Sequence, residues 1–355
     1  MDKSEKMDIS GGLSCPLPLS EYPQVLLAHG GGGKLSNQMI QRLIVPEFQN
    51  DYLEPLHDGA VVSLNGVRVA FSTDSFVVNP IFFPGGDIGE LAVNGTVNDI
   101  SMCGAKPLFL SAAFIVEEGF PMADLQRIVA SMHRAADSAE IQLITGDTKV
   151  VDRGKADKIF INTSGMGLVY PDVDIRPGNI RAGDRVILNG SLAVHGIAIM
   201  SVREGLEFET EIKSDTAALH GLVGEMLSAD PGIHVMRDLT RGGLASGLNE
   251  IAEKAGLGIH LRETDIPVGE DVRGACEILG LDPLYVANEG KFIAIVSPEV
   301  SDVILPVMRK HPLGKNARVI GEVVSDHPGT VLMKSRIGGN RVVDMLSGEQ
   351  LPRIC

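Results

Sequence analysis

The chain has 355 residues, enough for two domains of ordinary size, and 44% of them are hydrophobic against 22% charged, so a substantial core is expected. The net charge of −15 argues against binding to nucleic acid or an anionic membrane, and no apolar run reaches the roughly 18–20 residues of a membrane span. The four cysteines form neither a CxxC pair nor a zinc-ligand spacing, which favours a reducing, cytoplasmic setting.

The first half of the chain alternates strand and helix patterns. Residues 1–22 are polar, with Gly and Pro, and predict a flexible N-terminal extension. Residues 23–172 predict the first domain, which ends at a stretch rich in Pro, Gly and charge (171–184). Apolar periodicity predicts strands at 67–78, 107–119, 141–151 and 158–169, and helices at 88–105 and 121–140.

The second half, residues 173–336, repeats this alternation and predicts a second domain. Strands are expected in DRVILNG, HVMRDLT, GIHLRET, KFIAIVS, ARVIGEVVS and VLMKSR. Helices are expected at 195–206 and 215–229, and in GGLASGLNEIAEKAG, EDVRGACEILG and SDVILPVMRKH. Residues 337–355 predict a flexible tail with a hinge at Gly338 and Gly339. The fold class is therefore α/β (α+β), with two mixed α/β domains and a tail.

Four aspartates stand in loop-like stretches beside small or hydroxyl residues. They are Asp74 in STDSF, Asp99 in VNDIS, Asp147 in TGDTK and Asp238 in RDLTRGG. Hard cations such as Mg²⁺ need several oxygen ligands and bridge carboxylates to phosphates, so the four together predict one metal–phosphate site. Each aspartate taken alone is explained as well by a helix cap or a turn.

A run of glycines, HGGGGK, places Gly31 and Gly32 before Lys34. Such a backbone can approach phosphates closely and offer N–H donors, although the Walker A pattern is absent. A flexible loop without a ligand is an equally good interpretation of this run.

Three further polar positions suit proton or group-transfer chemistry. Lys149 follows Asp147 by two residues, on the same face of the expected strand, where a surface ion pair is the alternative. Glu289 in ANEGKF stands at the entry of a strand as a base or ligand, or simply as a turn residue. Cys355 in PRIC is not a prenylation site, because Pro352 stands where the modified cysteine would be, so chance or a carrier thiol remains.

These stretches together resemble the HypE family of [NiFe]-hydrogenase maturation proteins. The resemblance rests on TDSFVVNPIFFPGGDIGELAVNGTVNDISMCGAKP, ITGDTKVV, DLTRGGLASGLNEIA, VANEGK and the terminal PRIC, in this order from about His29 to Cys355. The wider group is the ATP-binding superfamily of aminoimidazole ribonucleotide synthetase, selenophosphate synthetase and thiamine-monophosphate kinase. Membership would imply two α/β domains of the aminoimidazole ribonucleotide synthetase type and a homodimer formed through the N-terminal, ATP-binding domain.

The resemblance also implies roles for individual residues. It assigns Asp74, Asp99, Asp147 and Asp238 to Mg²⁺. It assigns ATP contacts to Gly31, Gly32, Lys34, Asp74, Asn98, Asp147, Thr148 and Arg241. It assigns catalysis to Cys355, Asp99, Glu289 and Lys149.

The activity implied by the resemblance is an ATP-dependent dehydration on the protein's own Cys355. A carbamoyltransferase partner, HypF, would load the thiol as a thiocarbamate, and dehydration would give a thiocyanate. The cyano group would pass to iron on the HypC–HypD complex and become a cyanide ligand of the hydrogenase. Two other functions stay open, an ATP-dependent synthetase for a diffusible small molecule and an ATP-binding assembly scaffold without turnover.

Overall fold

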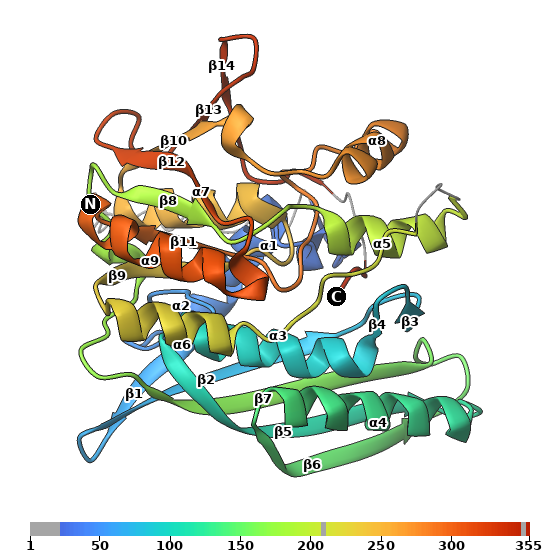
Figure 1. Ribbon diagram of the computed structural model, residues 1–355. Helices are drawn as coiled ribbons and strands as arrows, with labels where there is room; N and C mark the ends of the chain where they lie inside the picture. The colour runs from blue at the N-terminus through green and yellow to red at the C-terminus, as the bar shows by residue number, and fades with distance from the viewer. Residues whose placement is uncertain (1–21, 207–210, 349–352) are drawn as a thin grey trace, which may run out of the picture.

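The structure is a computed structural model that describes residues 22–206, 211–348 and 353–355. It contains two mixed α/β domains, each built on one large sheet (Figure 1). The helices are α1 (Lys34–Met39), α2 (Val45–Phe48), α3 (Ile88–Met102), α4 (Met122–Ser138), α5 (Val194–Arg203), α6 (His220–Ala229), α7 (Gly243–Ala255), α8 (Glu270–Leu279) and α9 (Pro298–Lys310). The strands are β1 (Ala60–Leu64), β2 (Val67–Phe76), β3 (Phe82–Phe83), β4 (Gly86–Asp87), β5 (Ala105–Glu117), β6 (Gln142–Val151), β7 (Ile159–Val169), β8 (Arg185–Leu188), β9 (Ile233–Asp238), β10 (Gly258–Arg262), β11 (Phe292–Val296), β12 (Arg318–Val324), β13 (Val331–Lys334) and β14 (Asn340–Val342).

The first sheet has the strand order β1-β2-β7-β5-β6, and only the β5–β6 pair is parallel. Helices α3 and α4 cover one face of this sheet (Figure 1). Side chains alternate along β2, so that Ala70, Ser72 and Phe76 are buried against the helices while Phe71 is exposed on the opposite face. The face of the sheet that no helix covers carries several large, exposed apolar side chains.

Helix α3 lies between the two domains and is buried on nearly all sides. Its apolar residues pack against the first sheet and α4, and it also contacts α6 and β9 of the second domain. Asp87 caps its N-terminus by accepting from the N–H groups of Gly89 and Glu90, at 2.8 and 3.1 Å. An all-round buried helix of this kind holds any polar side chain it carries at a fixed place between the domains.

The second sheet has the order β14-β13-β10-β12-β8-β11-β9, and β10–β13 is its parallel pair. Strand β11, which lies between β8 and the edge strand β9, is buried along its whole length, which explains the uninterrupted apolar run FIAIV. Helix α7 ends at Gly256, which adopts φ +64°, the left-handed conformation that favours glycine at a helix end. The expected two mixed α/β domains are therefore confirmed.

Several segments differ from the sequence-based expectation. Residues 215–219 precede α6 without regular secondary structure, because their backbone is bonded to the Asn98 side chain of α3 instead of continuing a helix. The strands β1 and β14 and the helices between 34 and 48 were not expected. The helices at 34–48 also lie beside the second domain, since Lys34 contacts residues of the C-terminal tail.

The C-terminal tail, 337–355, is docked on the body of the protein where the structure describes it. Strand β14 pairs with β13, Leu346 is buried, and Ile354 and Cys355 are 2% and 8% exposed. The expected flexible extension at 1–22 falls almost entirely outside the described residues. None of the helices in the described ranges has the length and apolar character needed to cross a membrane.

Candidate active site

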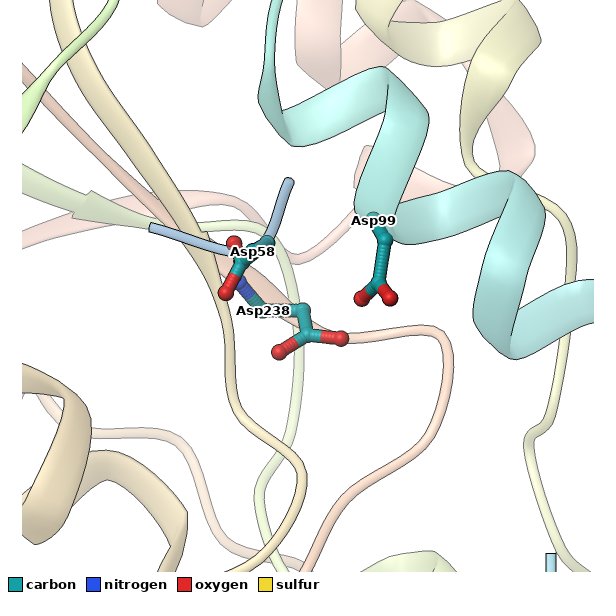
Figure 2. Close-up of side chains that lie close together, drawn as sticks. All are labelled: Asp58, Asp99 and Asp238. Atoms are coloured by element: carbon teal, nitrogen blue, oxygen red, sulfur yellow. The ribbon is translucent and has the colours of Figure 1, made fainter. Parts of the chain in front are cut away.

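Three carboxylates from different parts of the fold meet beside α3 (Figure 2). Asp58 comes from the loop before β1, Asp99 from α3 and Asp238 from the end of β9. One carboxylate oxygen of each lies within 4.8 Å of the others. All three are oxygen donors of the kind that Mg²⁺ prefers, so the site fits a hard divalent cation.

The surroundings of the three carboxylates fix their positions. The Ser72 hydroxyl lies 2.7 Å from Asp99 Oδ2, and Arg237 Nε lies 3.0 Å from Asp58 Oδ1. The other end of the Arg237 guanidinium donates to Glu250 Oε2 at 2.5 Å. The cluster therefore already contains one buried cation, held between two acidic side chains.

Burial raises the pKa of each carboxyl group in this cluster. The pKa of Asp238 rises to about 8, mainly through burial and then through the charge of Asp58. The pKa of Asp58 rises only to about 6, because Arg237 opposes the effect of burial. The pKa of Asp99 lies well above its usual value, through burial and the charges of Asp238 and Asp74. Without a cation the cluster therefore holds protons near neutral pH, and a bound cation would replace them.

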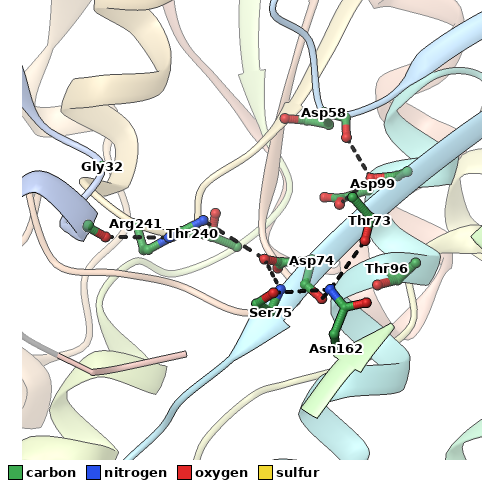
Figure 3. Close-up of polar contacts among 12 residues, drawn as sticks. Gly32, Asp58, Thr73, Asp74, Ser75, Thr96, Asp99, Asn162, Thr240 and Arg241 are labelled. Atoms are coloured by element: carbon green, nitrogen blue, oxygen red, sulfur yellow. Dashed lines mark hydrogen bonds and ion pairs between the residues drawn. The ribbon is translucent and has the colours of Figure 1, made fainter. Parts of the chain in front are cut away.

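Asp74 lines the same polar cavity as the cluster, together with Thr73, Thr240 and Arg241 (Figure 3). Its Oδ1 lies 3.9 Å from Arg241 Nη2 and accepts from the Ser75 N–H at 2.7 Å. Burial raises its pKa, and the Arg241 guanidinium lowers it. Asp74 and Arg241 thus form an edge of the site that presents both a carboxylate and a cation.

The C-terminal thiol lies in a second cavity that shares Arg241 with the polar one. This cavity has a volume of about 130 Å³, and Ser75, Gly31 and Tyr285 line it together with Cys355. Burial raises the pKa of the Cys355 thiol far above its usual value; Arg241 opposes this shift, and Glu289 reinforces it. Cys355 is therefore present as a thiol at neutral pH.

Glu289 is the buried carboxyl group near this thiol, at 2% exposure. Its Oε2 has no hydrogen-bond partner within the described part of the chain. Burial, followed by the charges of Asp238 and Asp74, raises its pKa well above the usual value. An unpaired carboxyl group in this position is free to accept a hydrogen bond or a proton from a group attached to the thiol.

The glycine run packs against Arg241 and the tail. A Cβ on Gly32 would lie 2.6 Å from Arg241 Cβ, and one on Gly33 would lie 2.3 Å from the Leu346 carbonyl oxygen. Gly31 lines the thiol cavity, as a ligand-binding glycine would. The Lys34 ammonium, expected at a phosphate, instead pairs with Asp344 at 2.5 Å on the surface.

Four other expected site residues do not reach the cluster within one chain. Asp147, Thr148 and Lys149 lie on β6, the exposed edge of the first sheet, where Lys149 Nζ donates to Asp147 at 2.6 and 2.7 Å. Strand pairing puts Asp147 on the opposite face from Asp74 and three strands away, roughly 14 Å at the usual strand spacing. The side-chain amide of Asn98 donates to the Ala217 carbonyl and accepts from the Leu219 N–H. It therefore holds the segment before α6 and does not face the site.

One carboxylate of the cluster was absent from the sequence-based set. Asp58 stands in HDGA, just before the alternating strand AVVSL. The available signal was an Asp-Gly pair at the entry of a strand, which gives this aspartate a small neighbour but no hydroxyl residue. The observed cluster is thus Asp58, Asp99 and Asp238 with Asp74 beside it.

Two family models match the chain in succession. AIR synthase related protein, N-terminal domain, matches residues 56–169, and AIR synthase related protein, C-terminal domain, matches residues 181–334. The carbamoyl dehydratase HypE of Cupriavidus necator is 54% identical over 330 residues, which are 93% of this chain and 94% of that protein. The HypE of Bradyrhizobium diazoefficiens is 55% identical over 330 residues, covering 93% and 95%.

Solved structures agree with these sequence matches. HypE in complex with ATP is 48% identical, with a TM-score of 0.79, over 94% of this chain and 100% of that chain. HypE in a HypE–HypF complex is 46% identical, with a TM-score of 0.83, over 87% and 99%. With both domains matched in order and nearly the full length shared at this identity, the chain belongs to the HypE family of hydrogenase maturation proteins, within the AIR synthase-like superfamily.

Proposed function

We propose that this protein uses ATP to dehydrate an S-carboxamide on its own Cys355 to a thiocyanate. The observation that carries the proposal is the placement of the C-terminal thiol in a buried cavity with Arg241, next to a carboxylate cluster of the metal-binding type. A diffusible substrate would not require the last residue of the chain at this place. The name carbamoyl dehydratase carried by the relatives gives the same reaction class.

The polar cavity, which shares Arg241 with the thiol cavity, suits the metal ion and phosphate end of Mg-ATP. Asp58, Asp99 and Asp238 would hold Mg²⁺, whose charge would offset the charge of the ATP phosphates. Arg241 lines both cavities and stays charged, because a guanidinium is not deprotonated in proteins. Its guanidinium is therefore placed to steady a phosphoryl group passing from the polar cavity to the thiol side.

The chemistry requires the carboxamide oxygen to leave and two N–H protons to be removed. Transfer of the terminal phosphoryl group of ATP to that oxygen turns it into the oxygen of a departing phosphate. The carbon–oxygen bond then breaks, a carbon–nitrogen triple bond forms, and the products are S–C≡N, ADP and phosphate. The thiocarbamate thereby loses the elements of water.

Glu289 is our choice for the group that takes a proton from the carboxamide nitrogen. It is buried in the surroundings of Cys355, and its Oε2 is unpaired in the described structure. Burial, and after it the negative charges of Asp238 and Asp74, raise its pKa. A cation that offsets those charges would lower the pKa and favour the carboxylate, which is the form that can accept a proton. Asp99 stays our second candidate for contact with the nitrogen.

A homodimer through the first sheet would complete the site. The uncovered face of this sheet exposes Phe71, Met166 and Leu168, at 47%, 42% and 45%, an apolar surface that a second copy can cover. Asp147 and Lys149 project from that same face, as their pairing with Ala113 and Ile115 of β5 indicates. We therefore assign these two residues to the site of the neighbouring copy.

The partners in the proposed cycle follow from the reaction. A carbamoyltransferase must first load Cys355, and the solved HypE–HypF complex makes HypF the natural donor. The cyano group would then pass to iron held by a HypC–HypD complex. Cys103, Cys276 and Cys355 are all free thiols, which is compatible with a reaction cycle in the reducing cytoplasm.

Intact mass spectrometry tests the proposed function. The protein is incubated with HypF and carbamoyl phosphate, and ATP with Mg²⁺ is then added. We expect the carbamoyl adduct to lose one water, about 18 Da, with ADP formed in equal amount; a Cys355→Ala variant should show neither change. ADP formation that persists in Cys355→Ala would favour a synthetase for a diffusible substrate, and nucleotide-dependent complex formation without ADP would favour a scaffold.

A further inference from the structure

The last three described residues lie in a cradle formed by both domains. Along one edge, the N–H of Val77 donates to the Cys355 carbonyl at 3.0 Å, and the N–H of Asn79 donates to the Arg353 carbonyl at 3.1 Å. The Ile354 carbonyl, which stands between these two, takes no part in this ladder and lies beside His195 instead. The other edge is where helix α5 of the second domain lies.

Helix α5 contacts the tail with two donors, of which only His195 lies on the side away from the ladder at 77–79. His195 Nε2 lies 3.0 Å from the Ile354 carbonyl oxygen, and Arg203 Nη2 donates to the Arg353 carbonyl at 2.9 Å. Between them, Ile199 and Met200 of the same helix belong to the apolar cluster that contains Ile354 and Cys355. One face of α5 thus contacts the tail through two polar groups and an apolar patch.

The hydrogen bonds of His195 define its chemical form. A carbonyl oxygen only accepts, so Nε2 must carry the proton that it shares with Ile354. The other nitrogen, Nδ1, lies 2.8 Å from the Ser214 hydroxyl, whose oxygen also accepts from the Thr216 N–H at 3.2 Å. The Ser214 proton is therefore available to Nδ1, which sets the neutral Nε2–H form; burial supports that form by lowering the pKa of His195.

We propose that His195 is a positioning residue. Its hydrogen bond to the Ile354 carbonyl sets the register of the tail so that the Cys355 thiol lies in the cavity. A slip of one residue would put another part of the chain where Cys355 lies and remove the thiol from the cavity. The imidazole is fully buried and contributes no group to the cluster of carboxylates. The proposal rests on the proposed function only for its consequence, that register controls dehydration.

The test compares two substitutions of nearly equal size. His195→Gln keeps an N–H donor near the position of Nε2, whereas His195→Leu fills the space without a donor. The first readout is the rate at which iodoacetamide alkylates Cys355 in the native protein, followed by mass spectrometry of the C-terminal peptide, with the buried Cys103 and Cys276 as internal references. This readout needs neither ATP nor HypF.

We expect His195→Leu to alkylate at Cys355 roughly fivefold faster than wild type, the factor that one net hydrogen bond is worth, and His195→Gln to stay close to wild type. Equal alkylation of both variants and wild type, or a Gln variant as reactive as the Leu variant, would overturn the proposal. Should His195→Leu fail to fold, Ser214→Ala keeps the imidazole but removes the hydroxyl that fixes its form, together with the bond from the Thr216 N–H. An unchanged alkylation rate in that variant would count against the proposal.

The second readout separates this proposal from the proposed function. After carbamoyl loading of Cys355, His195→Leu should lose the 18 Da more slowly than wild type in a single turnover, and His195→Gln should restore the rate. If alkylation responds as expected while wild type itself never loses the water, the docking role of His195 stands and the dehydratase assignment fails. If wild type dehydrates and His195→Leu matches it in both readouts, the positioning role fails alone.

Discussion

Raising the pH from 6 to 8 should strengthen the binding of Mg²⁺ to the carboxylate cluster. In the ion-free site the pKa of Asp238 is raised to about 8 and that of Asp58 to about 6, with burial the largest cause for both. Each carboxyl group must lose its proton before it can bind the ion. The ion and the protons therefore compete, and the competition weakens as the pH rises.

The size of the effect follows from the two pKa values. The ionised fraction of Asp238 grows from roughly 0.01 at pH 6 to roughly 0.5 at pH 8, which alone strengthens the apparent affinity about 50-fold. Asp58 adds about a factor of two over the same range. Asp99 changes in the same direction, because its pKa is also raised. We therefore expect an increase of roughly 100-fold or more.

Isothermal titration calorimetry in two buffers of different ionisation enthalpy measures both the affinity and the protons released. Asp238→Asn should weaken binding and remove most of its pH dependence, because the group with the high pKa is gone. Asp137→Asn is the matched control, since Asp137 lies exposed on α4. Equal affinity at pH 6 and pH 8 without proton release would refute the electrostatic description of the cluster.

Three further predictions concern catalysis, assembly and stability. Glu289→Gln should accept the carbamoyl group and bind ATP but slow the loss of water by ~10²–10⁴-fold. Glu299→Gln, a change at an exposed glutamate, should leave that rate unchanged, and a normal rate in Glu289→Gln by intact mass would exclude Glu289 as the base. Light scattering at micromolar concentration should give twice the chain mass of 37.8 kDa, and Met166→Asp on the uncovered sheet face should give the monomer; a wild-type monomer would contradict the dimer. The melting temperature of the ion-free protein should fall as the pH rises from about 4 to 8, because the folded state, with Asp238 at a pKa of about 8, binds more protons than the unfolded chain. Mg²⁺ should reverse this trend. A melting temperature that stays constant or rises without Mg²⁺ would argue against the raised pKa.

The sequence predicted most of the elements because their apolar periodicity was unambiguous. The strand at 67–78 and the helix at 88–105 appear as β2 and α3, one with alternating burial and the other buried all round. Residues 215–219 were assigned to a helix because their local composition allows one. Their backbone bonds to Asn98 override that local preference, and such a tertiary contact is invisible in a short window.

The candidate site was only partly predictable for two physical reasons. Asn98 and Asp99 are adjacent in sequence, but neighbours on a helix point about 100° apart, so one faces the cluster and the other the connecting segment. Asp147 has the right local motif, but the order of strands in a sheet is not written in any motif, and that order separates it from Asp74. Asp58 was overlooked because its short loop has no hydroxyl residue beside it.

The bonds between α3 and residues 216–219 determine how Cys355 can leave its cavity. Asn98 holds Ala217 and Leu219, and Asn94 contacts Thr216, so the two domains are tied together through one buried helix. Separating the two domains would break all of these contacts. Releasing residues 353–355 leaves them intact and breaks the short ladder at 77–79, the contacts to α5 and the ion pair of Arg353 with Asp157. The thiol therefore becomes accessible at the lowest free-energy cost when the chain end detaches and the two domains stay together. In hydrogen–deuterium exchange the Leu219 amide should then stay protected while the Val77 amide loses its protection.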